Sequence, residues 1–320
     1  MGNPPEMRMP DYHKPVLVKE TLTLLDPKES GVFVDATLGG GGHAVEILER
    51  VGPNGMLIGI DRDPEAIEYA RERLKQYGDR VMLVQGNYQD LESILTSIGI
   101  TEIDGALFDL GVSSHQLDVD RGFSFQRDEE LDMRMNPSEN TLSAKDIVNT
   151  YSESDLADLI WQYGEERYSR RIARAIVNRR EREPITRTKE LAEIIWNAVP
   201  PQYRHGEIHP ATRSFMSIRI RVNRELEAIE IGVPAAINAL KTGGRICVIS
   251  FHSLEDRIVK RLFRKFSGRC ECPPRFPQCQ CGAIERLKIL TNKPVVANDE
   301  EIKDNPRSRS AKLRCAMRVN

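Results

Sequence analysis

Aspartates close several short apolar segments in the first third of the chain, where a carboxylate can bind a cationic ligand. Asp35 closes the segment that begins at Val32, Asp61 follows residues 56–60, and Asp109 closes a third segment, ALFD. Ligands of open parallel α/β sheets bind at the carboxyl ends of the strands, so we expect these carboxylates at the mouth of one cleft. For Asp35 the alternative is a turn residue that caps the following loop.

A glycine loop, Gly39 to Gly42, separates a predicted strand over residues 32–36 from a predicted helix over residues 43–51. Glycine lets the backbone turn tightly and lets a ligand approach atoms that a Cβ would otherwise shield. The loop therefore indicates a cofactor site.

The type of cofactor is ambiguous from the glycines alone. Gly39, Gly41 and Ala44 match the dinucleotide pattern G-x-G-x-x-G/A, and Asp61 stands where that pattern places a ribose-binding acid. A pyrophosphate favours a helix N-terminus without nearby anions, whereas S-adenosylmethionine carries a sulfonium and an ammonium and no phosphate. The neighbouring acids therefore favour S-adenosylmethionine. Tyr88, after a predicted strand, is a candidate to stack on the adenine, with a rim aromatic as the alternative.

Asp109, Leu110 and Gly111 stand where class I methyltransferases present the acceptor to the methyl group. Methyl transfer is an in-line displacement to which a protein contributes mainly alignment, so no nucleophilic side chain is required. The lone pair of an exocyclic amine is delocalised, and a carboxylate or carbonyl that accepts the amine hydrogen would localise it. We therefore take Asp109 and the carbonyl of Leu110 as catalytic candidates, with cofactor contact alone as the alternative for Asp109.

Aromatic residues and a histidine are candidates to contact a substrate base. Phe123 and Phe125 could sandwich an extruded base, since enzymes that act on base atoms remove the base from its stack. A small core wedge is the more common role for such phenylalanines. His252 follows the fifth predicted strand and is expected to face the cleft and contact substrate. Ser253 with Asp256 fits a helix cap beside it.

Arginines at helical spacing indicate a basic surface. Arg167, Arg170, Arg171 and Arg174 recur at i, i+3, i+4 and i+7, which would place them on one helical face. A solvated face with interspersed glutamates is the usual explanation for such a run. A second basic concentration over residues 204–224 makes phosphate binding credible.

The cysteines near the C-terminus do not predict a catalytic metal. Cys270, Cys272, Cys279 and Cys281 form the pattern C-x-C-x6-C-x-C. Zinc-binding cysteine pairs are usually two to four residues apart, and a spacing of one residue strains a tetrahedral chelate. Reduced thiols or a redox-sensitive loop are the alternatives.

Composition and length narrow the class of protein. The chain has 320 residues, a formal net charge of −2 and 40% hydrophobic residues, which predicts two domains of ordinary globular composition. It contains no apolar run of ~20 residues that would span a membrane, and its N-terminus lacks an apolar segment, so we expect a cytoplasmic location and no membrane partner. Any nucleic-acid partner must be bound by a local basic patch.

The order of predicted elements indicates an α/β fold with an insertion. Strands and helices alternate from residue 32 to residue 111, which predicts parallel strands. The next strand comes only at residues 245–251, and the interval contains helical patterns, among them residues 153–181 and 211–230. We expect a sheet domain, residues 1–117 and 213–320, and an inserted helical domain, residues 118–212. Seven strands are expected, the last two as a hairpin.

The chain resembles the bacterial ribosomal RNA small-subunit methyltransferase H family, also called MraW. The resemblance covers nearly the whole chain and rests on a series of motifs in order: HKPVL (13–17), DATLGGGGH (35–43), GIDRDP (59–64), FDLGVSSHQLD (108–118), RGFSF (121–125), LDMRM (131–135) and SFHSLEDR (250–257). It implies a class I methyltransferase fold, with a Rossmann-like seven-stranded sheet and an inserted all-helical domain that recognises rRNA.

The same resemblance implies S-adenosylmethionine as cofactor and methylation of N4 of a decoding-region cytidine in 16S rRNA, on a largely assembled small ribosomal subunit. By position, the cofactor contacts of the family fall on Gly41, Gly42, His43, Asp61, Tyr88, Asp109 and Gln116. Tyr88 stands where many members of the family have phenylalanine. The cysteine loop is not shared throughout the family, which also counts against an essential metal.

Other functions remain as alternatives. A DNA amino methyltransferase commonly carries a D/N/S-P-P-Y/F/W box, and the prolines are missing after Asp109. An NAD-dependent oxidoreductase would need a glycine loop poor in anions. A small-subunit assembly factor could keep the cofactor fold without catalysis. The oligomeric state stays open, with a homodimer as one option.

Overall fold

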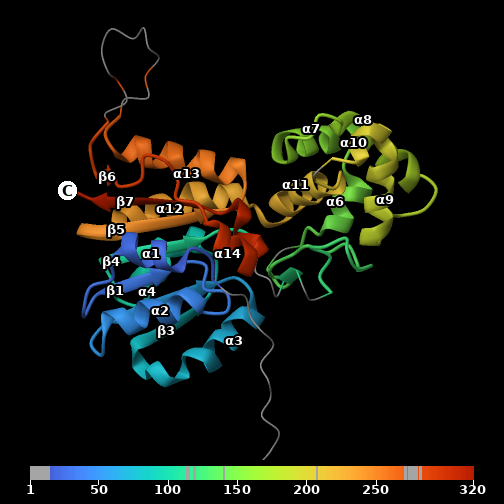
Figure 1. Ribbon diagram of the computed structural model, residues 1–320. Coiled ribbons are helices and arrows are strands. Elements are labelled where there is room, and N and C mark those ends of the chain that lie inside the picture. The colour runs from blue at the N-terminus through green and yellow to red at the C-terminus, as the bar shows by residue number, and fades with distance from the viewer. Residues whose placement is uncertain are drawn as a thin grey trace, which may run out of the picture. The chain divides into compact units, whose positions relative to one another are not determined.

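The computed structural model describes residues 15–112, 116–117, 120–139, 141–206, 208–269, 272, 280 and 283–320. The chain divides into two compact units (Figure 1). The sheet unit comprises Met1–Ser113 and Ala228–Asn320, and the helical unit comprises Ser114–Glu227. None of the described helices combines the length and the apolar character that crossing a membrane requires.

A seven-stranded sheet with the order β3-β2-β1-β4-β5-β7-β6 forms the centre of the sheet unit. The first five strands are parallel, and β7 is antiparallel to both of its neighbours, which confirms the expected strand number and the antiparallel pairing of the last two strands. The strands are β1 (Val32–Asp35), β2 (Met56–Asp61), β3 (Val81–Gln85), β4 (Ile103–Asp109), β5 (Leu240–Ser250), β6 (Leu287–Ile289) and β7 (Lys312–Arg318).

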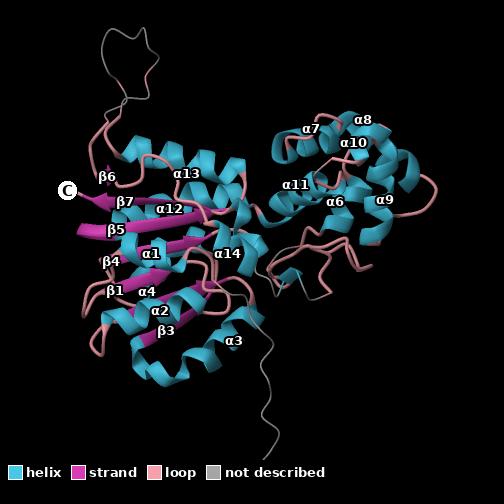
Figure 2. Ribbon diagram, viewed as in Figure 1, coloured by secondary structure: helices cyan, strands magenta, loops and turns pink. Residues whose placement is uncertain are grey.

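Helices cover both faces of this sheet (Figure 2). They are α1 (Val18–Leu25), α2 (Gly42–Val51), α3 (Pro64–Leu74), α4 (Leu91–Ser97), α12 (Glu225–Ala239), whose first turn belongs to the helical unit, α13 (Ser253–Phe266) and α14 (Asp299–Asp304). Short 3₁₀ helices are η1 (Lys75–Arg80), η2 (Tyr88–Asp90) and η3 (Pro306–Ser310).

Alternate strand residues face opposite layers, as the pleat requires. Phe33, Leu57 and Leu107 are buried in one cluster with apolar residues of α1, α2 and α3. Phe108, the neighbour of Leu107, instead contacts the ring of Tyr88, which packs against α12. The helices α1, α2 and α3 therefore share one face of the sheet, and α12 lies on the other.

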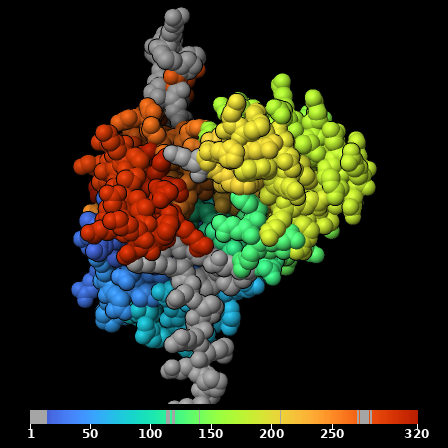
Figure 3. Space-filling model, turned by 45° about the vertical axis from the view of Figure 1, so that its right-hand side comes forward, coloured from blue at the N-terminus to red at the C-terminus, as the bar shows by residue number. Residues whose placement is uncertain are grey.

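The first and last described segments of the chain meet in the sheet unit. The Leu17 N–H, just before α1, donates a 2.6 Å hydrogen bond to Glu301 Oε1 in α14. Figure 3 shows the same proximity, with the red C-terminal residues adjoining the blue N-terminal ones on the surface of this unit. The segment after β5 thus closes over α1 and completes the core beneath it.

The described part of the helical unit has an irregular segment over residues 120–139 and 141–143, followed by helices. They are α6 (Ala144–Thr150), α7 (Glu153–Gly164), α8 (Ser169–Arg180), α9 (Thr188–Ala198), α10 (Pro201–Arg204) and α11 (Ala211–Asn223). Ser143 and Ser152 cap α6 and α7 by accepting backbone N–H groups with their hydroxyl oxygens. Such caps satisfy donors that the first helical turn leaves unpaired.

Two segments expected as continuous helices are each divided in the structure. Residues 153–181 form α7 and α8, because Glu165 adopts a left-handed conformation with φ 49°. Residues 211–230 break at Arg224, with φ 52°, between α11 and α12. Glycine normally occupies the left-handed position after a helix, and its absence at both positions hid these breaks in the sequence.

The boundary expected between residues 212 and 213 falls inside α11. This helix packs against α7, α6 and α9, so it belongs with the helical unit. Asn223 at its end accepts the Met135 N–H with Oδ1 at 2.9 Å and donates to the Met133 carbonyl at 2.7 Å. These buried hydrogen bonds hold the end of α11 to the loop that precedes α6, and the boundary moves to residues 227 and 228.

Candidate functional site

The glycine loop between β1 and α2 has a backbone that other residues would strain. Gly39 and Gly41 have φ values of 48° and 71°, and the Gly41 N–H closes the turn on the Leu38 carbonyl at 2.8 Å. A Cβ on Gly42, the first residue of α2, would lie 2.9 Å from Pro15 Cγ. The loop therefore needs glycine at Gly39 and Gly41 for its tight turn and at Gly42 to make room for Pro15.

Asp61 at the end of β2 fixes this loop. Its Oδ2 accepts the Gly39 N–H at 2.8 Å, and its Oδ1 accepts the Asp63 N–H at 2.9 Å. Burial raises the pKa of Asp61 to about 6, although these two hydrogen bonds oppose the shift. Each carboxylate oxygen has a second lone pair, so Asp61 can still accept hydrogen bonds from a ligand.

Register brings three aspartates to one layer of the sheet. Asp35 is level with Gly59 of β2 and with Leu107 of β4. Asp61 and Asp109 stand two residues beyond those partners, so the pleat turns all three carboxylates toward the same face. This is the face on which α2 begins, and the predicted convergence of acids at the strand ends is present within the sheet unit.

Asp35 is the most deeply buried of these acids, with 1% of its surface exposed. Burial raises its pKa to about 7, the nearby charge of His43 opposes that shift, and the Asp109 and Asp61 carboxylates add to it. Oδ1 accepts the Thr37 N–H at 3.3 Å, so the expected turn role is also present. With a pKa of about 7, the Asp35 carboxyl is partly protonated near neutral pH.

His43, the second residue of α2, lies beside Asp109. Its Nε2 is 3.6 Å from Asp109 Oδ2, and both side chains are largely buried. Burial acts to lower the pKa of His43, but the Asp109 and Asp35 carboxylates outweigh it, and the pKa lies above its usual 6.5. Among the described residues, His43 Nδ1 and Asp109 Oδ1 have no hydrogen-bond partner. Buried polar atoms left in this state mark a place for a polar ligand.

Thr37 positions the end of β4 and was not singled out in the sequence. Its Oγ1 accepts the Asp109 N–H at 2.6 Å, and the next residue, Leu110, donates its N–H to the Ile249 carbonyl at 2.9 Å. Gly111 follows with φ 100°. The sequence contained one signal for Thr37: a residue with a hydroxyl group directly follows the strand predicted over residues 32–36.

Tyr88 begins η2 and is held against the opposite face of the sheet. Its ring meets Phe108 edge-on, with 5.4 Å between ring centroids and an 85° angle between planes. A Cβ on Gly232 of α12 would lie 2.6 Å from Tyr88 Cδ2, so the glycine makes room for the ring. The ring is half-buried and its packing is fixed from two sides.

The profile of the MraW methylase family matches residues 11–319. The chain belongs to this family. Curated proteins named ribosomal RNA small subunit methyltransferase H are similar over their whole length: that of Geotalea uraniireducens is 54% identical over 97% of this chain and 100% of the relative, and that of Geobacter sulfurreducens is 52% identical over 96% and 99%. A solved rRNA methylase from Streptococcus thermophilus has 10% identity and a TM-score of 0.41, covering 95% of this chain and 94% of that one.

The fold of this MraW family member is that of a class I methyltransferase: a seven-stranded sheet whose last two strands pair antiparallel. The helical unit is inserted between β4 and β5. The predicted family and fold class are thus confirmed.

The helical unit of this MraW protein contains several of the predicted site residues. Gln116 and Phe123 are buried there, with 5% and 7% exposed. Phe125 packs against His209, at 4.7 Å between ring centroids, and against Phe215, at 5.0 Å. Such ring contacts favour the alternative interpretation, in which the phenylalanines pack within the protein instead of stacking on a substrate base.

The expected arginine face is only partly helical. Because α8 begins at Ser169, Arg167 lies outside the helix, and the prediction of four arginines on one helical face is wrong. Arg170, Arg171 and Arg174 are exposed on α8, and Arg174 pairs with Glu153 at 3.3 Å. Arg167 instead contacts tyrosine rings beside the helix start.

His252 caps α13 in place of the predicted Ser253. Glu255 Oε2 accepts the Phe251 and His252 N–H groups at 2.8 and 3.2 Å, whereas Asp256 binds Arg314. The His252 side chain, expected to face the cleft, is 9% exposed, with Nε2 3.1 Å from Glu255 Oε1.

Of the four cysteines of the C-terminal loop, Cys272 is described, and Cys270, Cys279 and Cys281 lie outside the described residues. Cys272 is half-buried, and its Sγ accepts the Gln280 N–H at 3.3 Å. Buried free thiols are found instead at Cys247 and Cys315, opposite each other on β5 and β7.

Proposed function

We propose that this MraW family member uses S-adenosylmethionine to methylate the N4 amine of a decoding-region cytidine in 16S rRNA, within the small ribosomal subunit. The observation that carries the proposal is the convergence of Asp35, Asp61 and Asp109 around a glycine loop. Buried polar atoms of His43 and Asp109 beside it find no hydrogen-bond partner in the described part of the chain. The names of the close relatives, which specify small-subunit rRNA, support the substrate.

The site suits a cationic methyl donor that carries hydroxyl and amino groups. Its carboxylates lie next to the backbone N–H groups at the start of α2. Polar groups of a ligand could bind the His43 and Asp109 atoms for which the described residues supply no partner. When bound, S-adenosylmethionine supplies a methyl group activated by the sulfonium. The proposed contacts are Asp35, Gly39, Gly41, Gly42, His43, Asp61, Tyr88, Asp109 and Gln116.

Asp109 and Leu110 are the proposed catalytic residues. Oδ1 of Asp109 makes no hydrogen bond within the described part of the chain, so it can accept a hydrogen of the cytidine amine and localise the nitrogen lone pair. Thr37 and the β5 backbone hold both residues in place, which limits the reorganisation that alignment would require. The Leu110 carbonyl is the second proposed acceptor.

Substrate contacts are proposed for basic and aromatic residues. Arg167, Arg170, Arg171 and Arg174 would bind RNA phosphates, since exposed arginines supply the salt-dependent part of such affinity. Phe123 is buried, Phe125 is half-buried against other rings, and the His252 side chain is 9% exposed. We therefore assign these residues to shaping the base-binding surface rather than to stacking directly on the base.

The test is complementation of a bacterial strain that lacks the N4 modification. Wild type should restore N4-methylcytidine in the decoding region, detected by mass spectrometry of 16S rRNA, and Asp109→Ala should not. Absence of the modified base with wild-type protein would contradict the enzymatic function. Rescue of subunit assembly by wild type and Asp109→Ala alike, without methylation, would indicate a non-catalytic assembly factor. Methylated DNA instead of rRNA would indicate a DNA amino methyltransferase.

A further inference from the structure

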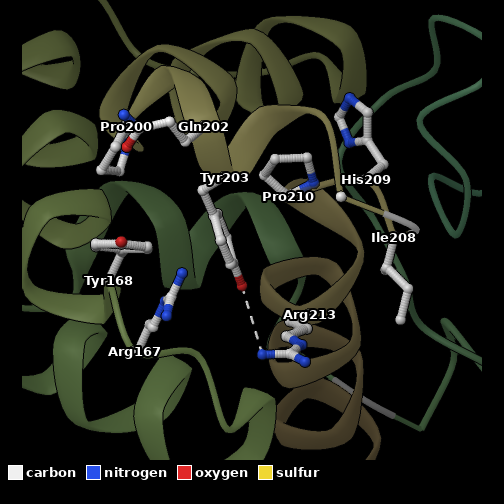
Figure 4. Close-up of a pocket in the computed structure, with 10 residues that line it drawn as sticks. Arg167, Tyr168, Pro200, Gln202, Tyr203, Ile208, His209, Pro210 and Arg213 are labelled. Carbon is white, nitrogen blue, oxygen red and sulfur yellow. Dashed lines mark hydrogen bonds between the residues drawn. The ribbon is translucent and has the colours of Figure 1, made fainter.

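A pocket of about 360 Å³ opens on the helical unit, and all of its lining residues belong to that unit. Arg167 and Tyr168 line it from the turn before α8, Tyr203 from α10 and Arg213 from α11. We call it the tyrosine–arginine pocket. Figure 4 shows Arg167 between the two tyrosines and the Tyr203 hydroxyl pointing toward Arg213.

Arg167 contacts two tyrosine rings that also contact each other. Its guanidinium carbon lies 4.8 Å from the centroid of Tyr168 and 4.8 Å from that of Tyr203. The two rings meet edge-on, 4.9 Å apart. Cation–π contact with both rings orients the guanidinium while the side chain of Arg167 stays exposed. An arginine in this state can bind an anion with little further loss of side-chain freedom.

A buried carboxylate anchors both tyrosines. Glu166 is 0% exposed, and its Oε2 accepts the Tyr203 hydroxyl at 2.6 Å. Its Oε1 accepts the Tyr168 N–H at 2.9 Å. Burial, with Glu166 next, raises the pKa of Tyr203, so the phenol stays protonated as a donor. The walls of the pocket are therefore preorganised.

The pocket carries positive charge. Neither Arg167 nor Arg213 forms an ion pair with a carboxylate of the described residues; Arg213 donates to the Tyr203 hydroxyl and the Glu165 carbonyl, both at 3.4 Å. Burial lowers the pKa of His209 at the rim, which is thus neutral at pH 7. Ile208, which is 55% exposed, forms an apolar part of the pocket lining, and Gln202 contributes a side-chain amide to it.

From this arrangement we infer that the tyrosine–arginine pocket holds one unpaired nucleotide of the RNA substrate, apart from the cytidine that is methylated. Arg167 and Arg213 bind its phosphate, and the base packs on Tyr168, with Gln202 able to contact its edge. Proteins bind single-stranded RNA by stacking bases on aromatic side chains next to arginines. The volume lies at the small end of ligand pockets, which suits one nucleotide. The inference takes RNA as the ligand from the proposed function.

The experiment measures RNA binding without methyl donor, so that it does not depend on catalysis. A fluorescein-labelled ten-nucleotide single-stranded RNA is titrated with wild type, Tyr168→Ala, Tyr168→Phe and Arg213→Gln, and anisotropy is followed. Tyr168→Ala should weaken binding by about tenfold, whereas Tyr168→Phe, which keeps the ring, should bind like wild type. Arg213→Gln should weaken binding and reduce the slope of log K against log salt by about 0.7. Tyr168→Ala removes no charge, so it should change that slope less than Arg213→Gln does.

Controls separate a pocket from general electrostatics. Lys145→Ala removes an exposed charge from the same unit outside the pocket and should bind RNA as wild type does. An RNA duplex of the same sequence should be insensitive to Tyr168→Ala, because its bases are not available for stacking. Circular dichroism and Tm confirm that each variant is folded.

Equal single-strand affinity of wild type and folded Tyr168→Ala would overturn the inference, as would no RNA binding by wild type. Methylation of small subunits by wild type would, in either case, leave the proposed function intact. Loss of binding in the pocket variants, without methyl transfer by wild type, would support the pocket and contradict the proposed function.

Discussion

His43 Nε2 lies 3.6 Å from Asp109 Oδ2, so the second residue of α2 faces the last residue of β4. The charge of His43 also lowers the pKa of Asp35, which burial raises to about 7. We expect His43→Gln to move the Asp35 pKa above about 7, as measured by carbon NMR titration of the aspartate carboxyls. Asp35→Asn assigns the signal, and His209→Gln in the helical unit is the control. An unchanged or lower Asp35 pKa would show that His43 does not act on this carboxyl.

Asp109→Asn keeps the shape of the side chain and removes its charge. Methyl transfer should fall by about 10²- to 10⁴-fold, the range for loss of a positioned proton acceptor. Transfer of a tritiated methyl group to small subunits that lack the modification measures the rate. Asp79→Asn, at an exposed position of the sheet unit, should keep wild-type activity. An Asp109→Asn rate within twofold of wild type would remove Asp109 from the mechanism.

Donor binding should release protons below neutral pH. In the free protein the pKa values of Asp35 and Asp61 are raised to about 7 and about 6, so at pH 6 Asp35 is mostly protonated and Asp61 partly so. A cation favours the ionised carboxylates; affinity should therefore fall as the pH drops through 7 and 6, and proton release should vanish above about pH 8. Calorimetry in two buffers of different ionisation enthalpy counts the protons. Asp35→Asn should reduce that count at pH 6, and a binding enthalpy independent of buffer would contradict the expectation.

Gly41→Ala tests whether the glycine loop contacts the donor, and Gly78→Ala is the control outside the proposed site. Both Gly41 and Gly78 have positive φ, 71° and 55°. Alanine should destabilise the protein by about 1–2 kcal/mol at Gly41, where ψ is 21°, and by more at Gly78, where ψ is −132°. A Cβ on Gly78 would meet nothing within 4 Å, and that residue lies in η1, outside the proposed site. Thermal unfolding should show a loss of stability for both variants, whereas calorimetry should show weaker donor binding only for Gly41→Ala. Equal donor affinity for both variants would argue that the loop does not contact the donor.

The sequence predicted those parts of the candidate site that are determined by residues close together in the chain. The glycine loop, the apolar strands and the aspartates at their ends are signals within a few residues, and all recur in the sheet unit. The contact of His43 with Asp109 depends on β1 lying between β2 and β4, with Asp35 level with Leu107. Strand order is a long-range property, so residue spacing alone could not reveal this contact.

The helical unit was harder to predict in detail. Glu165 and Arg224 end helices in left-handed conformations without glycine, and this moved Arg167 off the expected face. The tyrosine–arginine pocket joins residues 167–168 to residues 203 and 213 by tertiary packing around Glu166. A buried glutamate within a charged run looks like a solvated one in the sequence.

The insertion point has a consequence for synthesis on the ribosome. β4 ends up in the middle of the sheet, yet its partner β5 follows only after residues 110–239 have been made. Until then β4 has an open edge, and unpaired strand edges invite aggregation. The nascent chain must therefore keep four strands in a half-built sheet while the helical unit emerges and folds, which makes this interval the natural window for chaperone binding.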